Sequence, residues 1–420
     1  MKKYLMTSVA ALAFAATFTS CSKTDLYDEG RIEKEKVQST RDLYESNFVK
    51  HFGNISSDQK WGFDSTPIPQ IAGTRSHWKN KNQYRDFLNV PNEPTTDEIN
   101  TVTQWFTNTE SPATVNVNWS DFFVWQISST QNGKSHMDQL WCGASKESME
   151  HVNDFNAGNC GDESWVGPAT FMYNSGTAEF AYQESLTNQS SHTVYDHFVC
   201  IPGSVIAPND PVISKYYYVG FDYEATGTDP NQHVDRDYKY NDWIVRITPG
   251  EYKNTYRIVC EDLGTTDDFD FNDVVFDAAF DPIDGGNTVI ITVRAAGGRL
   301  PLYVAGTEVH SALGVPVSEE GIVNTGRKSV PIAIYRAPFT GTREHSWEWT
   351  FKDFKSIEVK VESEDAIYVL DSPQGKAPEK ILVGTDFVWP GERINIKTVY
   401  DKFSDYVQHP EKYSYNTWYK

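Results

Sequence analysis

The stretch from residue 261 to residue 273 places the strongest constraint on the fold of this chain. It carries a dense set of carboxylates and no Lys or Arg, and strand-like apolar runs lie directly before and after it. Neighbouring carboxylates raise one another's pKa, and burying an ionised carboxylate without a partner is costly. A hard divalent cation would remove this conflict, because Ca²⁺ accepts about 6–8 oxygen ligands. We therefore expect a Ca²⁺-binding loop that joins two strands, with a solvated acidic loop as the alternative.

This acidic element occurs a second time in the chain. Residues 237–242 read Asp-Tyr-Lys-Tyr-Asn-Asp, residues 268–273 read Asp-Phe-Asp-Phe-Asn-Asp, and apolar residues follow both copies. Each copy also follows a strand-like run that ends in acidic residues, so the repeated unit is strand, acidic loop and strand. The predicted metal ligands are Glu261, Asp262, Asp268, Asp270, Asn272 and Asp273 in the second copy, and Asp237, Asn241 and Asp242 in the first.

The spacing within the second copy has a geometric meaning. Alternate side chains of an extended chain point to opposite sides, so Asp268, Asp270 and Asn272 are expected to line one side of the loop. Phe269 and Phe271 would then anchor the other side in the core. The apolar residues after Asn272 change this alternation, which predicts a bend or bulge at residues 272–273.

The two copies differ in their suitability for a cation. The second copy is not an EF-hand, because Asp273 stands at the sixth position, which requires Gly, and Ala279 at the twelfth, which requires Glu. In the first copy, Lys239 occupies the position of Asp270. A cationic side chain in place of a ligand makes the second copy the stronger candidate. The first copy is either a weaker site or a loop held by pairing of Lys239 with an Asp.

Net charge and composition exclude some classes of protein. The formal net charge of −21 argues against binding to nucleic acid and against electrostatic adhesion to anionic membranes. The hydrophobic content of 39%, with 12 Trp, 23 Tyr and 23 Phe, is enough to build cores. A length of 420 residues predicts two or three domains of roughly 100–200 residues each.

The N-terminus resembles a bacterial lipoprotein signal. Lys2 and Lys3 precede a short apolar run over residues 6–18, and small residues then lead to Cys21. The resemblance implies a signal peptide over residues 1–20, cleavage before Cys21 and a lipid on its thiol. The run is shorter than the ~20 residues of a transmembrane helix, so we expect membrane attachment through the N-terminal lipid alone. Residues 22–29 resemble signals for surface export. The predicted location is therefore the outer membrane, facing the cell surface, with the periplasmic face as the alternative.

Four further cysteines lie beyond Cys21: Cys142, Cys160, Cys200 and Cys260. In an exported chain they can form two disulfides in three possible pairings. We favour Cys142–Cys160, because this pairing closes a short loop. Buried free thiols are the alternative for these cysteines.

Local patterns predict several individual elements. The charged stretch 29–52 predicts a helix that ends at Gly53, and the prolines and polar residues of 61–94 indicate an extended linker or loose packing. Thr95 and Glu98 form a capping box that begins a second helix. Strand-like runs include residues 256–260, 274–280, 302–304, 346–351 and 393–396, and residues 398–407 predict a closing helix.

The fold class is predicted from the sequence pattern after residue 115. Short strand-like runs alternate there with Asn, Gly, Ser and Pro, which is typical of antiparallel sandwiches. We predict a mainly β fold with two antiparallel β-sandwich-like domains and a short N-terminal helical region. Residues 21–94 would form the lipid anchor, tether and helix, residues 95–250 a β-rich domain with the first acidic loop, and residues 251–420 a domain with the second.

The second acidic loop also carries a family resemblance. The sequence Glu261-Asp-Leu, followed by Asp267-Asp-Phe-Asp-Phe-Asn-Asp-Val-Val-Phe, is similar to the opening signature of LruC-type domains of bacterial surface lipoproteins. It also resembles a broader group of predicted Ca²⁺-binding domains with an Asp-x-Asp-aromatic-Asn-Asp core. Residues 302–314 and the Trp389-Pro-Gly-Glu segment fit the same domain, so the resemblance covers residues 254–402. It implies a β-sandwich-like domain in an exported lipoprotein, and little about a ligand beyond the cation.

These observations predict a lipid-anchored, surface-exposed, calcium-binding β-sandwich protein with a binding or structural role in adhesion or in the capture of a glycan or protein. One alternative is an enzyme acting on polysaccharide with a structural Ca²⁺, and another is a pilus-like assembly subunit. The sequence has no Gly-x-Ser-x-Gly motif and no phosphate-binding loop. Its paired carboxylates are crowded within a few residues instead of facing each other across a cleft. We therefore predict no catalytic residue.

Overall fold

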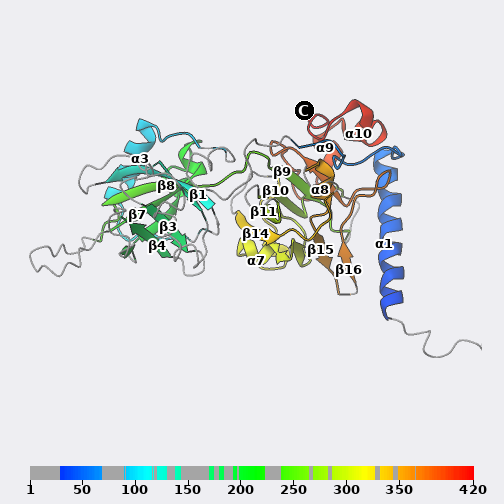
Figure 1. The fold of residues 1–420 in the computed structure, drawn as a ribbon, viewed down its shortest axis with the longest axis horizontal. Coiled ribbons are helices and arrows are strands. Elements are labelled where there is room, and N and C mark those ends of the chain that lie inside the picture. Colours follow the sequence, from blue (N-terminus) through cyan, green and yellow to red (C-terminus); the bar gives the residue numbers. More distant parts are fainter. Residues whose placement is uncertain are drawn as a thin grey trace, which may run out of the picture.

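A computed structural model describes residues 29–68, 89, 91–115, 117, 121–129, 138–142, 170–174, 179–183, 193–195, 198–222, 238–263, 268–281, 286–326, 332–343, 349–364 and 366–420. The fold is mainly β, as predicted, and the strand pairings in these residues are antiparallel. Figure 1 shows the strands gathered in two lobes. None of the helices in the described ranges is long and apolar enough to cross a membrane.

The N-terminal lobe is built on a five-stranded sheet with the order β2-β1-β8-β7-β6. Its strands are β1 (Asp121–Ser129), β2 (Asp138–Cys142), β6 (Phe198–Pro202), β7 (Tyr217–Phe221) and β8 (Trp243–Pro249). A smaller sheet contains β3 (Thr170–Asn174), β4 (Glu179–Gln183) and β5 (Thr193–Tyr195). The short helices α6 (Gly203–Ile206) and η4 (Ile213–Lys215) follow β6. Helix α3 (Thr96–Asn108) buries Val102 and Phe106 in a core that includes Ile127, Val199 and Ile244.

Helix α3 is tied to this sheet by a buried charge network. Thr95 Oγ1 accepts the backbone N–H of Glu98 at 3.2 Å, so the Thr95 half of the predicted capping box is confirmed. The Glu98 carboxylate accepts hydrogen bonds from Arg246 at 2.9 and 3.0 Å and from the Tyr218 hydroxyl at 2.8 Å. Both charged side chains are only 1% exposed, so each compensates the buried charge of the other.

The C-terminal lobe contains a five-stranded sheet of order β14-β11-β10-β9-β17 and a four-stranded sheet of order β13-β12-β15-β16. The strands of the first are β9 (Tyr256–Cys260), β10 (Val274–Phe280), β11 (Thr288–Ala296), β14 (Ala333–Pro338) and β17 (Lys380–Val383). Those of the second are β12 (Leu302–Val304), β13 (Thr307–Glu308), β15 (Val359–Glu362) and β16 (Ile367–Val369). One hydrophobic core includes Phe276 and Ile291 from the first sheet and Leu302 and Val361 from the second.

Short helices complete this lobe: α7 (Val309–Leu313), η5 (Glu319–Gly321), α8 (Phe351–Lys355), α9 (Ile396–Val399), α10 (Phe403–Gln408) and η6 (Pro410–Lys412). The strands predicted over residues 256–260, 274–280 and 302–304 are confirmed as β9, β10 and β12. The strand predicted over residues 346–351 is wrong at its C-terminal end, because Phe351 begins α8. The Asp353 carboxylate caps this helix by accepting the backbone N–H of Thr350 at 2.7 Å.

Two further differences concern the last part of the chain. The strand predicted over residues 393–396 is wrong, because Ile396 begins α9 and the Asn395 side chain caps it through the Lys397 N–H at 3.1 Å. The closing helix predicted over residues 398–407 is divided between α9 and α10. Strand β17 has no counterpart among the predicted strands.

The N-terminal helix belongs to the C-terminal lobe. Helix α1 (Glu29–Phe52) has the predicted bounds, and Figure 1 shows it standing beside this lobe. Its residues Phe48 and Phe52 are buried in the same core as β9 and β10. Gly53 follows with φ +91, a left-handed conformation that glycine adopts without steric cost, and its N–H donates to the Val49 carbonyl at 2.8 Å.

The linker predicted for residues 61–94 is wrong for residues 61–68. Trp61, Phe63 and Ile68 are 0%, 4% and 3% exposed and lie in the C-terminal core. The Ile68 N–H donates to the Trp349 carbonyl at 2.7 Å. These apolar residues are separated by polar residues and prolines without a helical or strand period, so only their tertiary contacts reveal that they are buried.

The N-terminal lobe is inserted into the C-terminal lobe. Among the described residues, the buried C-terminal core takes residues from Tyr44 to Ile68 and then none until Ile258, whereas the N-terminal core takes residues between Val102 and Ile244. The Asn89 N–H donates to the Glu251 carbonyl at 2.7 Å, so the chain enters and leaves the inserted lobe at neighbouring points.

Two of the cysteines have a defined state. Cys200 and Cys260 are buried free thiols, and burial raises the pKa of each far above its ordinary value. Cys160, the side chain of Cys142, the signal region with Cys21, and Asp237 lie outside the described residues. The Cys142–Cys160 disulfide and the lipid anchor therefore stay predictions.

Candidate metal centre

The two acidic loops connect strands in the same way. The second loop joins β9 to β10, and Cys260 at the end of β9 pairs with Val274 at the start of β10. The first loop joins β7 to β8, and Phe221 pairs with Trp243 at the corresponding place. The repeated unit of strand, acidic loop and strand is therefore confirmed.

The backbone of the second loop is not extended as the alternation predicted. Phe269 and Phe271 have φ of 50° and 52°, in the left-handed region that costs a non-glycine residue roughly 1–2 kcal/mol. Hydrogen bonds within the loop hold this conformation: Glu261 Oε2 accepts the Phe271 N–H at 3.0 Å, and Asp270 Oδ1 accepts the Asn272 N–H at 3.2 Å. The chain bends at Asp273, as the predicted bend or bulge at residues 272–273 requires, and the pairing of β10 with β11 also shifts further along, between Val275 and Phe276.

The aromatic side chains of the loop are anchored as predicted. Phe269 and Phe271 are fully buried. The ring of Phe269 lies 5.3 to 5.5 Å from the rings of Tyr44, Phe48 and Phe52 on helix α1. Tilted and edge-on contacts at these distances are favourable for aromatic pairs. The loop is thus fixed to an element that precedes it by more than two hundred positions in the chain.

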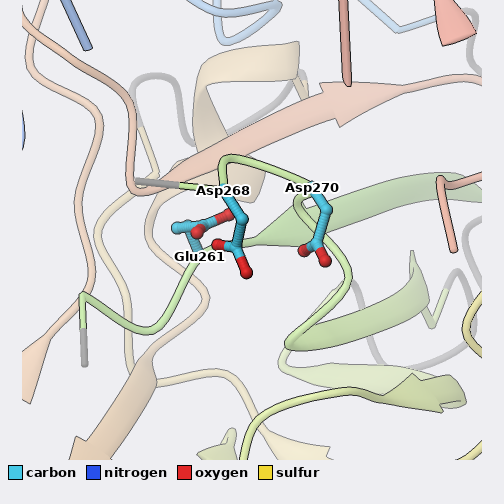
Figure 2. Close-up of side chains that lie close together, drawn as sticks. All are labelled: Glu261, Asp268 and Asp270. Carbon is cyan, nitrogen blue, oxygen red and sulfur yellow. The ribbon is translucent and has the colours of Figure 1, made fainter. Parts of the chain in front are cut away.

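Three of the predicted ligands come together. One carboxylate oxygen each of Glu261, Asp268 and Asp270 lies within 4.8 Å of the others. Figure 2 shows the three side chains next to one another, with Asp268 drawn between the other two. Oxygen ligands lie about 2.3–2.6 Å from Ca²⁺, so two ligands on opposite sides of one ion are about 5 Å apart. The three groups therefore fit a single ion.

The cluster is electrostatically unfavourable by itself. Glu261 and Asp270 are each 3% exposed. Burial raises the pKa of Glu261 well above its ordinary value, and the charges of Asp273, Asp270 and Asp268 raise it further. Burial and the Asp268 charge raise the pKa of Asp270 to about 7, although the backbone N–H of Arg393 donates to its Oδ2 at 2.7 Å. A bound cation would offset this repulsion, because it favours the ionised form of every nearby carboxylate.

Other predicted ligands of the second loop have structural contacts. Asp273 Oδ2 accepts the Asp262 N–H at 2.7 Å and so closes the loop where the two strands meet. Burial raises the pKa of Asp273, and the charges of Asp262 and Asp270 add to this. The Asp273 carbonyl also accepts the N–H groups of Gly297 and Gly298. Neither Asp262 nor Asp273 belongs to the cluster of three.

Asn272 links the loop to a distant segment. Its Nδ2 donates to the Pro390 carbonyl at 3.1 Å, and its Oδ1 has no hydrogen-bond partner among the described residues although the side chain is fully buried. A Cβ on Gly297 would lie 2.1 Å from this oxygen, so only glycine fits there.

One acidic residue near the loop was absent from the predicted ligands. Glu392 Oε2 is buried without a hydrogen-bond partner in the described part of the chain. Burial raises the pKa of Glu392, and the charge of Asp268 raises it further. Glu392 therefore interacts electrostatically with the acidic loop. The only signal in the sequence is the Trp389-Pro-Gly-Glu segment, which entered the family resemblance but not the ligand set.

The first loop is described in part. Tyr238 has φ 61 and occupies the position of Phe269, so the backbone of the two copies agrees there. The Asp242 N–H donates to the Phe221 carbonyl at 3.1 Å, and Asn241 Nδ2 donates to Thr107 Oγ1 at 3.5 Å. Within the described ranges, no carboxylate cluster like that of the second loop forms here. Its cation site stays a prediction.

Comparisons of the chain with protein-family models, with curated proteins and with solved structures found no match. The resemblance to LruC-type domains therefore stays a prediction that rests on the residues of the acidic loop.

Proposed function

We propose that this protein is a lipid-anchored surface protein whose C-terminal lobe binds Ca²⁺ through its second acidic loop, and that its role is binding or structural. The observation that carries the proposal is the convergence of Glu261, Asp268 and Asp270, with one oxygen of each within 4.8 Å of the others. The outer-membrane location and the lipid on Cys21 rest on the N-terminal sequence alone.

The chemistry of the loop favours Ca²⁺ over other metals. All three clustered groups offer carboxylate oxygen, the ligand type of hard cations, whereas structural zinc sites are built mainly from nitrogen and sulfur. A second observation supports a cation: Asn272 Oδ1 and Glu392 Oε2 are buried without hydrogen-bond partners among the described residues. Buried polar atoms of this kind need an explanation, and an ion is one.

The position of the loop favours a structural role for the ion. The loop contacts helix α1 through Phe269, the residue after strand β11, Gly297, through backbone hydrogen bonds, and the segment after Trp389 through Asn272. An ion here would hold together parts of the chain that are far apart in sequence. We propose a β-sandwich-like arrangement for this lobe, because its two sheets contribute to one core.

Thermal unfolding of the mature chain tests the cation site. We expect Ca²⁺ to raise the melting temperature and EDTA to reverse the effect, since a ligand bound to the native state at 100 times its Kd adds about 2.7 kcal/mol of stability. Asp270→Asn should remove most of this response. Asp401→Asn, which changes an exposed carboxylate outside the loop, should leave it intact. The proposal is wrong if EDTA leaves the melting temperature unchanged and calorimetry detects no heat of Ca²⁺ binding.

The polysaccharide-acting enzyme and the pilus-like subunit stay alternatives, as does capture of a glycan or protein as the particular binding role.

A further inference from the structure

A polar cleft of about 250 Å³ lies on the face of the C-terminal five-stranded sheet that points away from the core. Asp277 on β10 and Thr292 and Arg294 on β11 line it, whereas Phe276 and Ile291, which alternate with them, lie in the core. The segment over residues 249–255 forms a further wall. The cleft is therefore separate from the acidic loop.

The floor of the cleft carries an unequal set of charges. Asp277, which is 1% exposed, accepts hydrogen bonds from Arg257 Nε at 2.7 Å and Nη2 at 3.0 Å, and from Arg294 Nε at 2.7 Å. Although burial raises the pKa of Asp277, the guanidinium groups of Arg294 and Arg257 hold it below its ordinary value, so this carboxylate is ionised. On the buried floor, one negative charge thus faces two positive charges, whereas the carboxylate of Glu251, which is 57% exposed, lies at the edge of the cleft.

Arg294 presents unused donors to the cleft. Its Nε donates to Asp277, and its Nη2 lies 3.8 Å from Oε1 of Glu251, beyond hydrogen-bond distance. Among the described residues, Nη1 and Nη2 have no hydrogen-bond acceptor. The Arg294 side chain is 13% exposed, and its ion pair with Asp277 fixes its orientation. The Nη1 and Nη2 edge of the guanidinium group is therefore already oriented before a ligand binds. Such an edge matches a carboxylate through two parallel hydrogen bonds.

The remaining lining suits a hydroxyl-bearing ligand. Thr292 and Thr385 line the cleft, and Lys253 is exposed and adds a further positive charge. Drug-sized ligands occupy pockets of roughly 300–1,000 Å³, so a cleft of about 250 Å³ suits a single sugar unit.

We infer that this cleft binds a sugar that carries a carboxylate, such as a hexuronate unit, with the carboxylate on Arg294 and the sugar hydroxyls facing the threonines. This assignment rests on the proposed binding role and names a ligand class for it. The carboxylate supplies the charge that the floor lacks, and the hydroxyl groups replace the water that the polar lining would otherwise hold.

Isothermal titration of the mature chain in saturating Ca²⁺ tests the assignment with D-glucuronate as the probe. We expect saturable binding of D-glucuronate, no binding of D-glucose, which lacks the carboxylate, and at least about 10-fold weaker binding of acetate, which lacks the ring. Absence of saturable D-glucuronate binding overturns the inference. Acetate binding as tightly as D-glucuronate overturns the sugar part of it.

Variants locate the site. Arg294→Gln should weaken D-glucuronate binding about 10-fold or more, because charged hydrogen bonds are the strong ones. Lys253→Gln should weaken it severalfold, and since Lys253 is exposed this variant keeps its fold even if Arg294→Gln does not. Arg343→Gln, which removes an arginine that stacks on Trp349 outside the cleft, should bind normally. Unchanged affinity in both cleft variants, or an equal loss in Arg343→Gln, contradicts the assignment.

Failure of the two proposals can be told apart. Loss of the Ca²⁺ effect on the melting temperature with D-glucuronate binding retained counts against the metal centre alone. Normal stabilisation by Ca²⁺ without D-glucuronate binding counts against the cleft alone.

Discussion

At the scale of single residues, the acidic loop balances hydrogen bonding against repulsion. Asp270 accepts backbone N–H groups from Asn272 and Arg393, which favours its ionised form. Burial and the charge of Asp268 act in the other direction and prevail, so the pKa of Asp270 rises. Without a cation, the native state therefore holds a proton that the unfolded chain would release.

This balance predicts an unusual pH dependence. The pKa of Asp270 rises from 3.8 to about 7 in the folded protein, and the pKa values of Glu261 and Asp273 rise as well. The native state therefore binds more protons than the unfolded state between about pH 4 and pH 7, and stability must fall as pH rises through this window. In EDTA, we expect a lower melting temperature at pH 8 than at pH 5.

Calcium should reverse this trend, because the ion binds the ionised carboxylates and competes with protons. With Ca²⁺ present, the melting temperature should be at least as high at pH 8 as at pH 5. Melting curves at both pH values, recorded for the unmodified chain and for Asp270→Asn, provide the check. A metal-free protein that gains stability between pH 5 and pH 8 would contradict the raised pKa values.

At the scale of elements, helix α1 carries one face of the acidic loop. Phe48 is fully buried and contacts the rings of Phe269, Phe52 and Trp61. The same helix also closes part of the lobe by charge: Arg41 Nε donates to Glu379 at 2.6 Å. The helix is thus part of the core of the C-terminal lobe.

Truncation of the Phe48 side chain should therefore destabilise the folded protein. We expect Phe48→Ala to lower the free energy of unfolding by about 3–5 kcal/mol, the usual range for a buried Phe. Leu43→Ala on the same helix is the matched control, because Leu43 is 64% exposed and should change stability by about 0.5 kcal/mol or less. Urea unfolding followed by tryptophan fluorescence measures both. Similar losses in the two variants would show that the helix does not pack as described.

At the scale of the whole molecule, the chain has a discontinuous lobe. Residues 44–68 share a core with residues 258–418, while described residues between Val102 and Ile244 build a separate core. The hydrogen bond from the Asn89 N–H to the Glu251 carbonyl joins the two chain segments that connect the lobes. The predicted boundary at residue 251 therefore marks where the chain returns to a lobe that it had already begun.

Two truncated chains test this organisation. Residues 29–68 joined to residues 252–420 through a flexible Gly/Ser linker should unfold cooperatively and respond to Ca²⁺. Residues 252–420 alone should not, because they lack Trp61, Phe48 and the other N-terminal core residues. Calorimetry distinguishes the outcomes. Equal melting temperatures for the two chains would mean that residues 29–68 are dispensable for the fold.

The sequence by itself determined the features that local signals encode. Helix α1 and strands β9 and β10 have their predicted bounds. The signals that set these bounds, an apolar pattern along each element and Gly53 after the helix, lie within the element or next to it. The repeat located both acidic loops, and the crowding of carboxylates indicated a shared site.

Only the tertiary structure decided which groups meet. The left-handed backbone at Phe269 and Phe271 places Asp268 and Asp270 beside Glu261 and leaves Asp262 and Asp273 to close the loop. The core residues of 61–68 had no local signal, and Glu392 had only the Trp389-Pro-Gly-Glu segment, because the surroundings of both come from segments more than a hundred positions away. The packing of those segments sets the burial, and burial sets the charge behaviour of the loop.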